Sequence, residues 1–567
     1  MDGFQWLLFF LFIQVIHFLG TWKLYRAAGE NPWKAIVPVY NAIVLLKILH
    51  RPKWWVLLLF LPVINLMMFM VLWVDTVKHF GKNSPLHGVI AVLSLGLFIY
   101  TVNYQKNPKY IADKSMITRS AFNEWIGSII FAVVAATFVH NYFFQPYIIP
   151  TGSLEKSLLI GDFLFVSKFH YGARVPSTTI AFPMVHDTLP LIKNRSYLKK
   201  PQLPYMRFPK FQKIKRNDIV VFNWPADTVR QFFVKEAAVK KPTDKKSNYV
   251  KRCVGLPGDN LEIKKGFVYI DGKKNVLPDR ARVQHSFTAY NDKGISSRKL
   301  SQLGIKDFYR RFRIENITQN SYAKLAPYIL GTSGNSADNF EVITRESGIP
   351  ITLVRSLGLG ISEVLEKSKE INLTVDEAVV IEKQAWIDSL VQRNQKIKTP
   401  NTSFFPNKIP FDWNQDNFGP IQIPARGQTI TINLSNLPLY KKIIVDYENN
   451  SLKTIGNDIF INDKKVTQYT FLQDYFWMMG DNRHRSEDSR FWGFVPEDHI
   501  VGKPVFIWFS IDGINDGISN WKIRWDRVFS TVGGEGKRVS YFPYFLIFII
   551  IWQGYIFIRK RRKKKVS

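Results

Sequence analysis

A serine in a turn-like segment is the first residue of this chain that could act as a nucleophile. Ser153 follows Pro-Thr-Gly within PYIIPTGSLEKSLLIGD, residues 146–162. A turn of this composition exposes side chains and leaves backbone N–H groups free to bind a developing negative charge. No glycine stands two residues after Ser153, so the segment is not the G-x-S-x-G nucleophile elbow. Serines in turns are common, and chemistry at Ser153 therefore requires a base from elsewhere in the chain.

The candidate base is a lysine inside an apolar, strand-like run. Lys251 lies in YVKRCVGLPGD, residues 249–259, and is followed by Arg252. Successive residues of a strand point to opposite faces, so the sequence predicts that one of these two side chains faces inward. Arginine stays charged, whereas burial lowers the pKa of a lysine and can leave a neutral amine that accepts a proton from serine. We therefore predict Lys251 as the general base.

A polar loop, GDNRHRSEDSRFWGF at residues 480–494, could orient that lysine. The hydroxyl of Ser486 could exchange a hydrogen bond with the amine. Asp488 and Arg490 could form a charge-assisted ion pair, as Asp and Arg do at close range. Taken alone, the same residues could belong to an ordinary hydrogen-bonded loop.

Other bases remain open at this point. Lys156 competes with Lys251, but three residues after Ser153 in a polar turn we expect it to stay solvated and charged. A Ser-His-Asp hydrolase is also possible in principle, although no carboxylate spacing singles out a histidine. The histidines concerned are His170, His484 and His499.

The 567-residue chain is long enough for several domains, and it is strongly basic. It has 77 Lys+Arg against 45 Asp+Glu, a formal net charge of +32, and 46% hydrophobic residues. The apolar content excludes disorder over most of the length. The single cysteine, Cys253, excludes an internal disulfide framework, a thiolate zinc site and an iron–sulfur cluster. The basic excess requires an anionic partner, either nucleic acid or anionic lipid.

Apolar stretches near both ends predict membrane-spanning helices, because about 20 apolar residues cross a bilayer as a helix. The five stretches of this kind are 4–20, 54–74, 88–104, 125–144 and 541–558. A sixth, 35–46, is shorter and contains Pro38, so we predict that it is interfacial or re-entrant. The first stretch is not expected to be a cleaved leader, because its Met-Asp-Gly start lacks basic residues and no small-x-small site follows.

Basic residues flank these stretches unevenly, which predicts their orientation. They concentrate in 21–53, in 105–124 and in the tail 559–567, and the loop 75–87 has fewer. The positive-inside rule places the basic segments in the cytoplasm and exports residues 145–540. A basic tail directly after a span is better explained as an anchor to anionic lipid than as a nucleic-acid arm. We therefore predict a multi-pass protein of the cell membrane without a nucleic-acid partner.

The exported region consists mainly of predicted short strands. Runs rich in β-branched and aromatic residues, bounded by Gly, Asp, Asn or Pro, recur through 145–280 and 406–540. The polar interval 281–405 is predicted to be an insertion, and within it 361–397 has helical spacing. The predicted fold is a membrane region over 1–124 with α-helical spans, followed by a mainly β exported domain that carries a mixed, partly helical insertion.

Together, the three chemical segments resemble those of the bacterial type I signal peptidases. These are membrane-bound Ser/Lys-dyad proteases that cut leader peptides from exported preproteins. The resemblance covers about 125–280 and 405–510 in matching order, including GDFLFVSKFHYGARVP at 161–176. The extra N-terminal spans and the insertion at 281–405 make the chain similar to extended forms of the family.

The resemblance implies a role for each residue of the three segments. Ser153 is the implied nucleophile and Lys251 the implied general base. Ser486 would orient Lys251, while Asp488 and Arg490 would brace the loop. The implied fold of the exported domain is a set of antiparallel β-sheets.

The resemblance also implies residues that bind the substrate. The oxyanion hole would combine the backbone N–H of Ser153 with the hydroxyl of Thr151, which stands where the family usually has Ser. Leu154 and Lys156 replace the family's usual Met and Pro, and leucine keeps an apolar pocket wall. The implied pocket residues for small substrate side chains are Tyr147, Ile149, Leu154, Leu158, Tyr249 and Val250.

The function that this resemblance implies is removal of signal peptides by cleavage after small residues, on the exported side of the membrane. Its partners would be preproteins bearing signal peptides and the lipid bilayer, with the export translocon nearby. No metal or cofactor is implied, and no H-E-x-x-H pattern occurs.

Two rival functions fit the residues less well. A self-cleaving Ser/Lys protease of the SOS-repressor type would need a DNA-binding helical domain and a cytoplasmic catalytic part, and neither is predicted. A membrane-anchored binding or assembly protein with a degenerate protease domain is disfavoured, because Ser153, Lys251 and Ser486 are all present.

Overall fold

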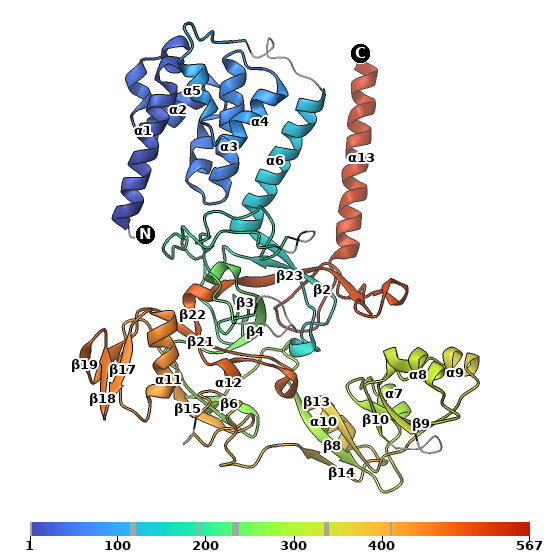
Figure 1. Cartoon of the computed structure of the whole chain (residues 1–567). Helices are drawn as coiled ribbons and strands as arrows, with labels where there is room; N and C mark the ends of the chain where they lie inside the picture. Colours follow the sequence, from blue (N-terminus) through green and yellow to red (C-terminus); the bar gives the residue numbers. More distant parts are fainter. Residues whose placement is uncertain are drawn as a thin grey trace.

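The computed structural model describes residues 3–113, 121–189, 192, 194–229, 238–333, 340–408 and 411–566. Figure 1 shows the N-terminal helices at one end of the molecule, a large β-sheet in the middle and the 281–405 segment at the other end. The last helix, α13 (Phe542–Val566), extends from the sheet toward the same side as the N-terminal helices. Two cations of the predicted cytoplasmic loop 105–124, Lys114 and Arg119, lie outside the described residues.

The N-terminal helices enclose an apolar core of their own. The helices are α1 (Gly3–Ala27), α2 (Tyr40–Ile48), α3 (Ile64–His79), α4 (Pro85–Leu93), α5 (Phe98–Asn103) and α6 (Ala121–Tyr142). Leu24, Leu46 and Leu72 belong to one buried cluster that joins α1, α2 and α3. Met68 and Val134 join α3 to α6 in a second cluster. Because α6 leads directly into the first strand, this bundle is attached to the β-sheet.

Within the described residues, two helices are long and apolar enough to cross a membrane. They cover Phe4–Ala27 and Phe542–Arg559, at the places where the stretches 4–20 and 541–558 predict spans. A third apolar helical stretch, Ser128–Tyr142, lies within the predicted span 125–144 but is shorter.

The stretch 54–74 does not form one helix, contrary to the prediction. Residues Lys53–Phe60 form 3₁₀ turns, and α3 begins only at Ile64. Between them Leu61 is extended, with φ −90° and ψ 116°. Leu61 precedes Pro62, and a proline disfavours helical backbone at the residue before it. Apolar composition therefore predicted one continuous helix, whereas Pro62 divides the stretch into two segments.

The stretch 88–104 is also divided, into α4 and α5. Leu95 and Gly96 between them have φ angles of +52° and +83°. A Cβ on Gly96 would lie 2.6 Å from the Trp73 ring, so glycine is needed for this close approach as well as for the left-handed backbone. The 35–46 stretch is likewise split, because a short 3₁₀ turn ends at Ala35 and α2 starts at Tyr40.

The central sheet is antiparallel and has the strand order β1-β2-β23-β3-β4-β21-β22, with β24 and β25 also paired to β23. The bounds are β1 (Phe144–Ile148), β2 (Asp162–Ser167), β3 (Ile219–Asn223), β4 (Asn248–Gly255), β21 (Tyr475–Met479), β22 (Val495–Pro496), β23 (Ile500–Asp512), β24 (Lys522–Ile523) and β25 (Ser530–Thr531). Strand β23 pairs with β2 over one part of its length and with β3 over another. Apart from Phe144 at the start of β1, all of these strands lie within 145–280 and 406–540, where the sequence predicts short strands.

Smaller sheets cover one end of the central sheet. Their strands are β5 (Asn260–Lys264), β6 (Phe267–Ile270), β7 (Lys273–Lys274), β15 (Phe418–Gln422), β16 (Thr429–Thr431), β17 (Leu452–Ile455), β18 (Asp458–Ile461), β19 (Lys464–Val466) and β20 (Gln468–Thr470). The helix α11 (Leu437–Lys442) packs with them. Their shared core contains Phe418, Trp477 and Phe494, and the Trp477 ring contacts the rings of the other two. Trp477 belongs to β21, so this core joins the small sheets to the central one.

The 281–405 segment forms two further sheets, ordered β13-β8-β14 and β10-β11-β9-β12. Its elements are β8 (Gln284–Tyr290), α7 (Ser297–Gln302), β9 (Tyr309–Glu315), α8 (Gln319–Leu325), β10 (Gly331–Ser333), β11 (Phe340–Arg345), α9 (Ile351–Ser356), β12 (Gly360–Glu363), β13 (Ser368–Thr374), α10 (Val375–Glu382) and β14 (Ser389–Gln392). The helix predicted over 361–397 is wrong apart from α10. Strand β13 instead pairs along its whole length with β8, and this long-range pairing overrides the local helical preference.

A buried ion pair attaches the segment that precedes α13 to the central sheet. Both carboxylate oxygens of Asp162, at the start of β2, accept hydrogen bonds from Arg527, at 3.0 and 2.5 Å. Ser510 of β23 donates a further hydrogen bond to Asp162 at 2.7 Å. All three residues are buried, so the carboxylate depends on these donors for its stability.

We predict that Arg527→Met lowers the free energy of unfolding by about 3–5 kcal/mol, because it leaves a buried carboxylate without its cation. The measurement is the thermal unfolding midpoint of the detergent-solubilised chain. Lys453→Met is the control: it removes an ion pair to Asp463 whose side chains are 66% and 77% exposed, and it should change stability by no more than about 0.5 kcal/mol. Equal midpoints for the two variants would contradict this prediction.

Candidate active site

The turn that carries Ser153 connects β1 to β2. Residues 152–154 form a short 3₁₀ turn, and the loop is closed by a hydrogen bond from the Gly161 N–H to the Ile149 carbonyl at 2.9 Å. Leu154 is buried beneath the turn and anchors it in the apolar core, whereas Ser153 is half-buried and Thr151 is exposed. The neighbouring strand β1 follows α6 after one residue, so α6 joins one end of β1 and this turn lies at the other.

Lys251 lies on β4, between β3 and β21 in the central sheet. It is opposite Val220 of β3, and its side chain is only 3% exposed. The Nζ atom lies 5.6 Å from the centre of the Tyr249 ring. Burial lowers the pKa of Lys251 to about 8, although the nearby carboxylates of Asp488 and Glu487 oppose this shift. At pH 7 about one tenth of this amine is therefore neutral, far more than for an ordinary lysine.

The next residue corrects one expectation from the sequence. Lys251 and Arg252 do diverge, but both are buried. The Arg252 side chain donates to both carboxylate oxygens of Asp481, at 2.7 and 2.5 Å, and Ser157 donates to the same carboxylate at 2.5 Å. Burial alone would raise the pKa of Asp481, but Arg252 and Ser157 hold it below its ordinary value. The inward-facing arginine is thus tolerated because its charge is paired.

The structure brings the three predicted segments together. Cα atoms of β4 lie within 8 Å of those in the Ser153 turn. Asn482, in the polar loop, donates from its backbone N–H to the Ser153 carbonyl at 3.1 Å and from its side chain to the Gly152 carbonyl at 3.2 Å. The loop 480–490 is therefore hydrogen-bonded directly to the turn that holds the predicted nucleophile.

Gly480 makes this approach possible. A Cβ on Gly480 would lie 2.2 Å from the Ser486 Oγ atom and 2.6 Å from the Ser153 carbonyl oxygen. Any side chain at this position would separate the loop from the turn. Ser486 Oγ is buried and has no hydrogen-bond partner among the residues that the structure describes. A hydroxyl in that state is expected to find a partner, because unsatisfied buried polar groups are costly.

The ion pair expected between Asp488 and Arg490 is present. The carboxylate of Asp488 accepts from Arg490 Nε at 2.9 Å and from Nη2 at 2.8 Å, and it also accepts from the Gly480 N–H at 3.0 Å. Both side chains are fully buried. Burial would raise the pKa of Asp488, but Arg490 and the Gly480 hydrogen bond keep it below its ordinary value.

The residues expected to line substrate pockets divide into two groups. Ile149, Leu154 and Leu158 are 3%, 1% and 0% exposed and pack in the apolar core beneath the turn, so they offer almost no free surface to a substrate. Tyr147 and Val250 are half-buried against that core. Tyr249 is also half-buried, and its ring stacks on Trp224 with the centres 5.1 Å apart.

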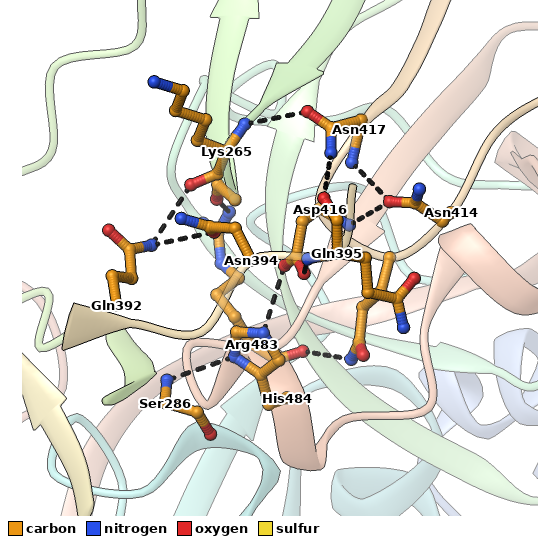
Figure 2. Close-up of polar contacts among 12 residues, drawn as sticks. Lys265, Ser286, Gln392, Asn394, Gln395, Asn414, Asp416, Asn417, Arg483 and His484 are labelled. Carbon is orange, nitrogen blue, oxygen red and sulfur yellow. Dashed lines mark hydrogen bonds and ion pairs between the residues drawn. The ribbon is translucent and has the colours of Figure 1, made fainter. Parts of the chain in front are cut away.

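The three histidines are engaged in other interactions. His170 contacts Ser167 at 2.5 Å, and His499 contacts Asp498 at 2.6 Å. Figure 2 shows His484 between the backbone N–H of Ser286 at 3.2 Å and the carboxylate of Asp416 at 3.0 Å. None of these contacts includes Ser153, so they give no support to a Ser-His-Asp arrangement.

His484 connects Ser286 of the 281–405 segment to Asp416, a contact that sequence patterns did not predict. Its partner Asp416 also accepts from the Gln395 N–H at 2.9 Å, within the network of amide side chains drawn in Figure 2.

Lys156, the competing base, forms an ion pair with Glu377 of α10 at 2.5 Å. The positions of these partners, far away along the chain, explain why spacing alone could not identify them.

Comparison with known proteins finds similar proteins of known class. Relatives include the signal peptidase I of Buchnera aphidicola, 25% identical over 440 residues, which are 75% of this chain and 91% of the relative. The signal peptidase I of Helicobacter pylori is 23% identical over 427 residues, 74% of this chain and 94% of that protein. Residues 33–113 match a family of unknown function (DUF5684). The model described as signal peptidase, peptidase S26, matches residues 122–323 and 419–509, which include the Ser153 turn, β4 and the loop 480–490, and the chain therefore belongs to the peptidase S26 family of signal peptidases.

Proposed function

We propose that this chain is a membrane-bound serine endopeptidase that removes signal peptides from preproteins, with Ser153 as nucleophile and Lys251 as general base. The observation that carries the proposal is the environment of Lys251. Its amine is buried on the strand next to the Ser153 turn, with a pKa of about 8. Lysine perturbed in this way beside a serine is suited to proton abstraction. The named relatives are signal peptidases, which supplies the substrate class.

The proposed reaction is a two-step acyl transfer. Neutral Lys251 accepts the hydroxyl proton of Ser153, and Oγ attacks the carbonyl carbon of the scissile bond. The oxyanion accepts hydrogen bonds from the Ser153 N–H and the Thr151 hydroxyl. Lys251 then gives its proton to the leaving amine, which releases the mature protein and leaves an ester on Ser153. Lys251 next takes a proton from water, whose oxygen attacks the ester carbonyl carbon. Lys251 returns this proton to Ser153 Oγ as the bond to the acyl carbon breaks, and the signal peptide leaves with a free carboxyl group.

Ser486 is the proposed positioning group for the lysine. Its buried Oγ lacks a partner among the described residues and belongs to the loop that is bonded to the Ser153 turn. A hydroxyl can accept from an ammonium and donate to a neutral amine, so it can hold Lys251 in both protonation states. Substrate pockets that admit only small residues are proposed around Tyr147, Tyr249 and Val250, which retain free surface.

We further propose a multi-pass topology with the β domain on the exported side. The helices at 4–27 and 542–559 have suitable length and hydropathy, and Figure 1 places the chain's C-terminal end on the side away from the β-sheets. Exposed apolar side chains at Phe182, Met184 and Leu198 suit contact with lipid near this domain. Tethering through α6 would hold Ser153 near the membrane face, where a signal peptide's cleavage site emerges.

We predict that Ser153→Ala and Lys251→Met each lower kcat/KM for preprotein cleavage by at least about 10³-fold, because each removes a group that acts in the acylation step. Cleavage is followed by gel analysis of a purified preprotein. Lys442→Met is the matched control, since burial also lowers the pKa of Lys442 to about 8. Normal cleavage by Lys251→Met, or equal loss in Lys442→Met, would contradict the proposed dyad.

The pH dependence follows from the same lysine. Only the neutral amine accepts a proton, so kcat/KM should rise tenfold per pH unit at low pH and level off above a midpoint near 8, the pKa of Lys251. Glu487→Gln should move this midpoint to lower pH, because the exposed Glu487 carboxylate raises the pKa of Lys251. A profile that is flat between pH 6 and 9 would be incompatible with a lysine base of this kind.

The topology predicts which residues a membrane-impermeant maleimide can reach in intact cells. Cysteine introduced by Lys274→Cys, in β7, should be labelled. Cysteines from Lys106→Cys and Lys564→Cys should react only after permeabilisation. Native Cys253 is fully buried and provides no background. Labelling of position 564 in intact cells would overturn the proposed orientation.

A further inference from the structure

The 281–405 segment touches both loops of the candidate active site. Gln284, at the start of β8, donates from its backbone N–H to the Asp481 carbonyl at 2.8 Å. Its side-chain amide donates to the Glu155 carbonyl at 2.9 Å. Arg485, next to Ser486, forms an ion pair with Asp307 of the same segment. The segment is therefore seated on the Ser153 turn and on the loop 480–490 at once.

A buried chain of amides runs from this segment to the Ser153 turn. Asn372 of β13 donates to the side-chain oxygen of Asn482 at 2.8 Å and to Asp307 at 2.9 Å. Asn482 in turn donates to the Gly152 carbonyl at 3.2 Å. Asn372 and Asn482 are only 2% and 3% exposed. Asn372 thus fixes the amide orientation in which Asn482 binds the turn.

A second contact joins the 281–405 segment to Lys156, three residues after Ser153. Lys156 has a φ of +67°, a left-handed conformation that non-glycine residues rarely adopt. Its Nζ atom lies 2.5 Å from the carboxylate of Glu377. Glu377 is itself fixed, because the same carboxylate accepts from the Thr374 N–H in the capping box that starts α10. The ion pair therefore holds a strained residue of the turn against a rigid helix end.

We propose that Asn372 and Glu377 are positioning residues for the acylation step, through which the 281–405 segment holds the Ser153 turn in its reactive conformation. This inference rests on the proposed function of Ser153. Both residues lie in residues 324–418, which the signal peptidase family model does not match. These two residues thus support the active site of this chain from outside the matched residues.

The chemistry that depends on this positioning is the placement of Ser153 Oγ and of its backbone N–H. Removing Asn372 leaves the buried oxygen of Asn482 without its donor, so the amide can rotate and release the Gly152 carbonyl. Neutralising Glu377 frees Lys156 and allows the strained backbone to relax. Neither change touches Lys251, so the base should keep its pKa.

The test measures kcat, KM and the pH profile for preprotein cleavage by the full-length chain. Asn372→Ala and Glu377→Gln should each lower kcat by about 10- to 100-fold, the scale of a small misplacement of reacting groups. KM should stay within about twofold and the pH midpoint should stay at its wild-type value. Glutamine can still accept the Thr374 hydrogen bond, so Glu377→Gln preserves the cap of α10. Lys156→Met combined with Glu377→Gln should cause no loss beyond the single variants.

Two matched controls lie within the same segment. Asn291→Ala removes a side-chain hydrogen bond to Asp388. Glu363→Gln removes an ion pair to Arg310 whose exposure resembles that of Lys156 and Glu377. Both controls should keep wild-type kcat. If Asn372→Ala does not fold, Glu377→Gln and the double variant decide the matter.

Wild-type kcat in Glu377→Gln and Asn372→Ala, or equal losses in the controls, would overturn this inference. Lys251→Met separates the two proposals. If Lys251→Met is inactive while the two positioning variants are fully active, only the inference about the 281–405 segment fails. If Lys251→Met is active, the proposed function fails.

Discussion

The candidate site depends on a lowered pKa for a lysine that lies beside acidic residues. Asp481 and Asp488 both lie in the loop next to Lys251, and their carboxylates raise its pKa. Each aspartate has its own buried guanidinium, Arg252 for Asp481 and Arg490 for Asp488. Because these pairs offset the negative charge, burial dominates and the pKa of Lys251 falls to about 8. The arrangement of the loop follows from this charge pairing.

The pairing of β4 with β21 places Arg252 where it can pair with Asp481. It places Arg252 opposite Met479, immediately before the loop that begins at Gly480. The missing side chain of Gly480 then lets Ser486 and the Ser153 turn approach from the same side. The central sheet fixes the lysine, and the hydrogen bonds of Asn482 fix the turn relative to the loop. A site of this kind is precise because it is built from strands and short, well-bonded turns.

The sequence predicted residue types and local pairs more successfully than distant contacts. Ser153, Lys251 and Ser486 stood out by their surroundings, and the structure brings their segments together. The Asp488–Arg490 pair was predictable because its members are two residues apart. Partners far away in sequence, such as Asp481 for Arg252 and Glu377 for Lys156, leave no local pattern, because only the folded chain brings them into contact.

The wrong predictions also arose because local composition and spacing do not show how the folded chain packs. The apolar stretches at 54–74 and 88–104 were counted by composition, but Pro62 and Gly96 interrupt them as helices. The 361–397 interval has helical spacing, yet β13 is recruited into a sheet by β8. The resemblance implied substrate contacts for Ile149, Leu154 and Leu158, but all three are buried beneath the turn. An apolar residue near a nucleophile can line a pocket or support one from below. The sequence does not distinguish these two positions, whereas their burial does.

The most direct test of this account is the protonation of Lys251 itself. The chain labelled with [ε-¹³C]lysine can be titrated by NMR, and the Lys251 resonance identified by its absence from Lys251→Met. We predict a resonance that titrates with a midpoint near 8, the pKa set by burial. A midpoint at or above about 10, the ordinary range for lysine, would show that the amine stays charged and would contradict the proposed mechanism.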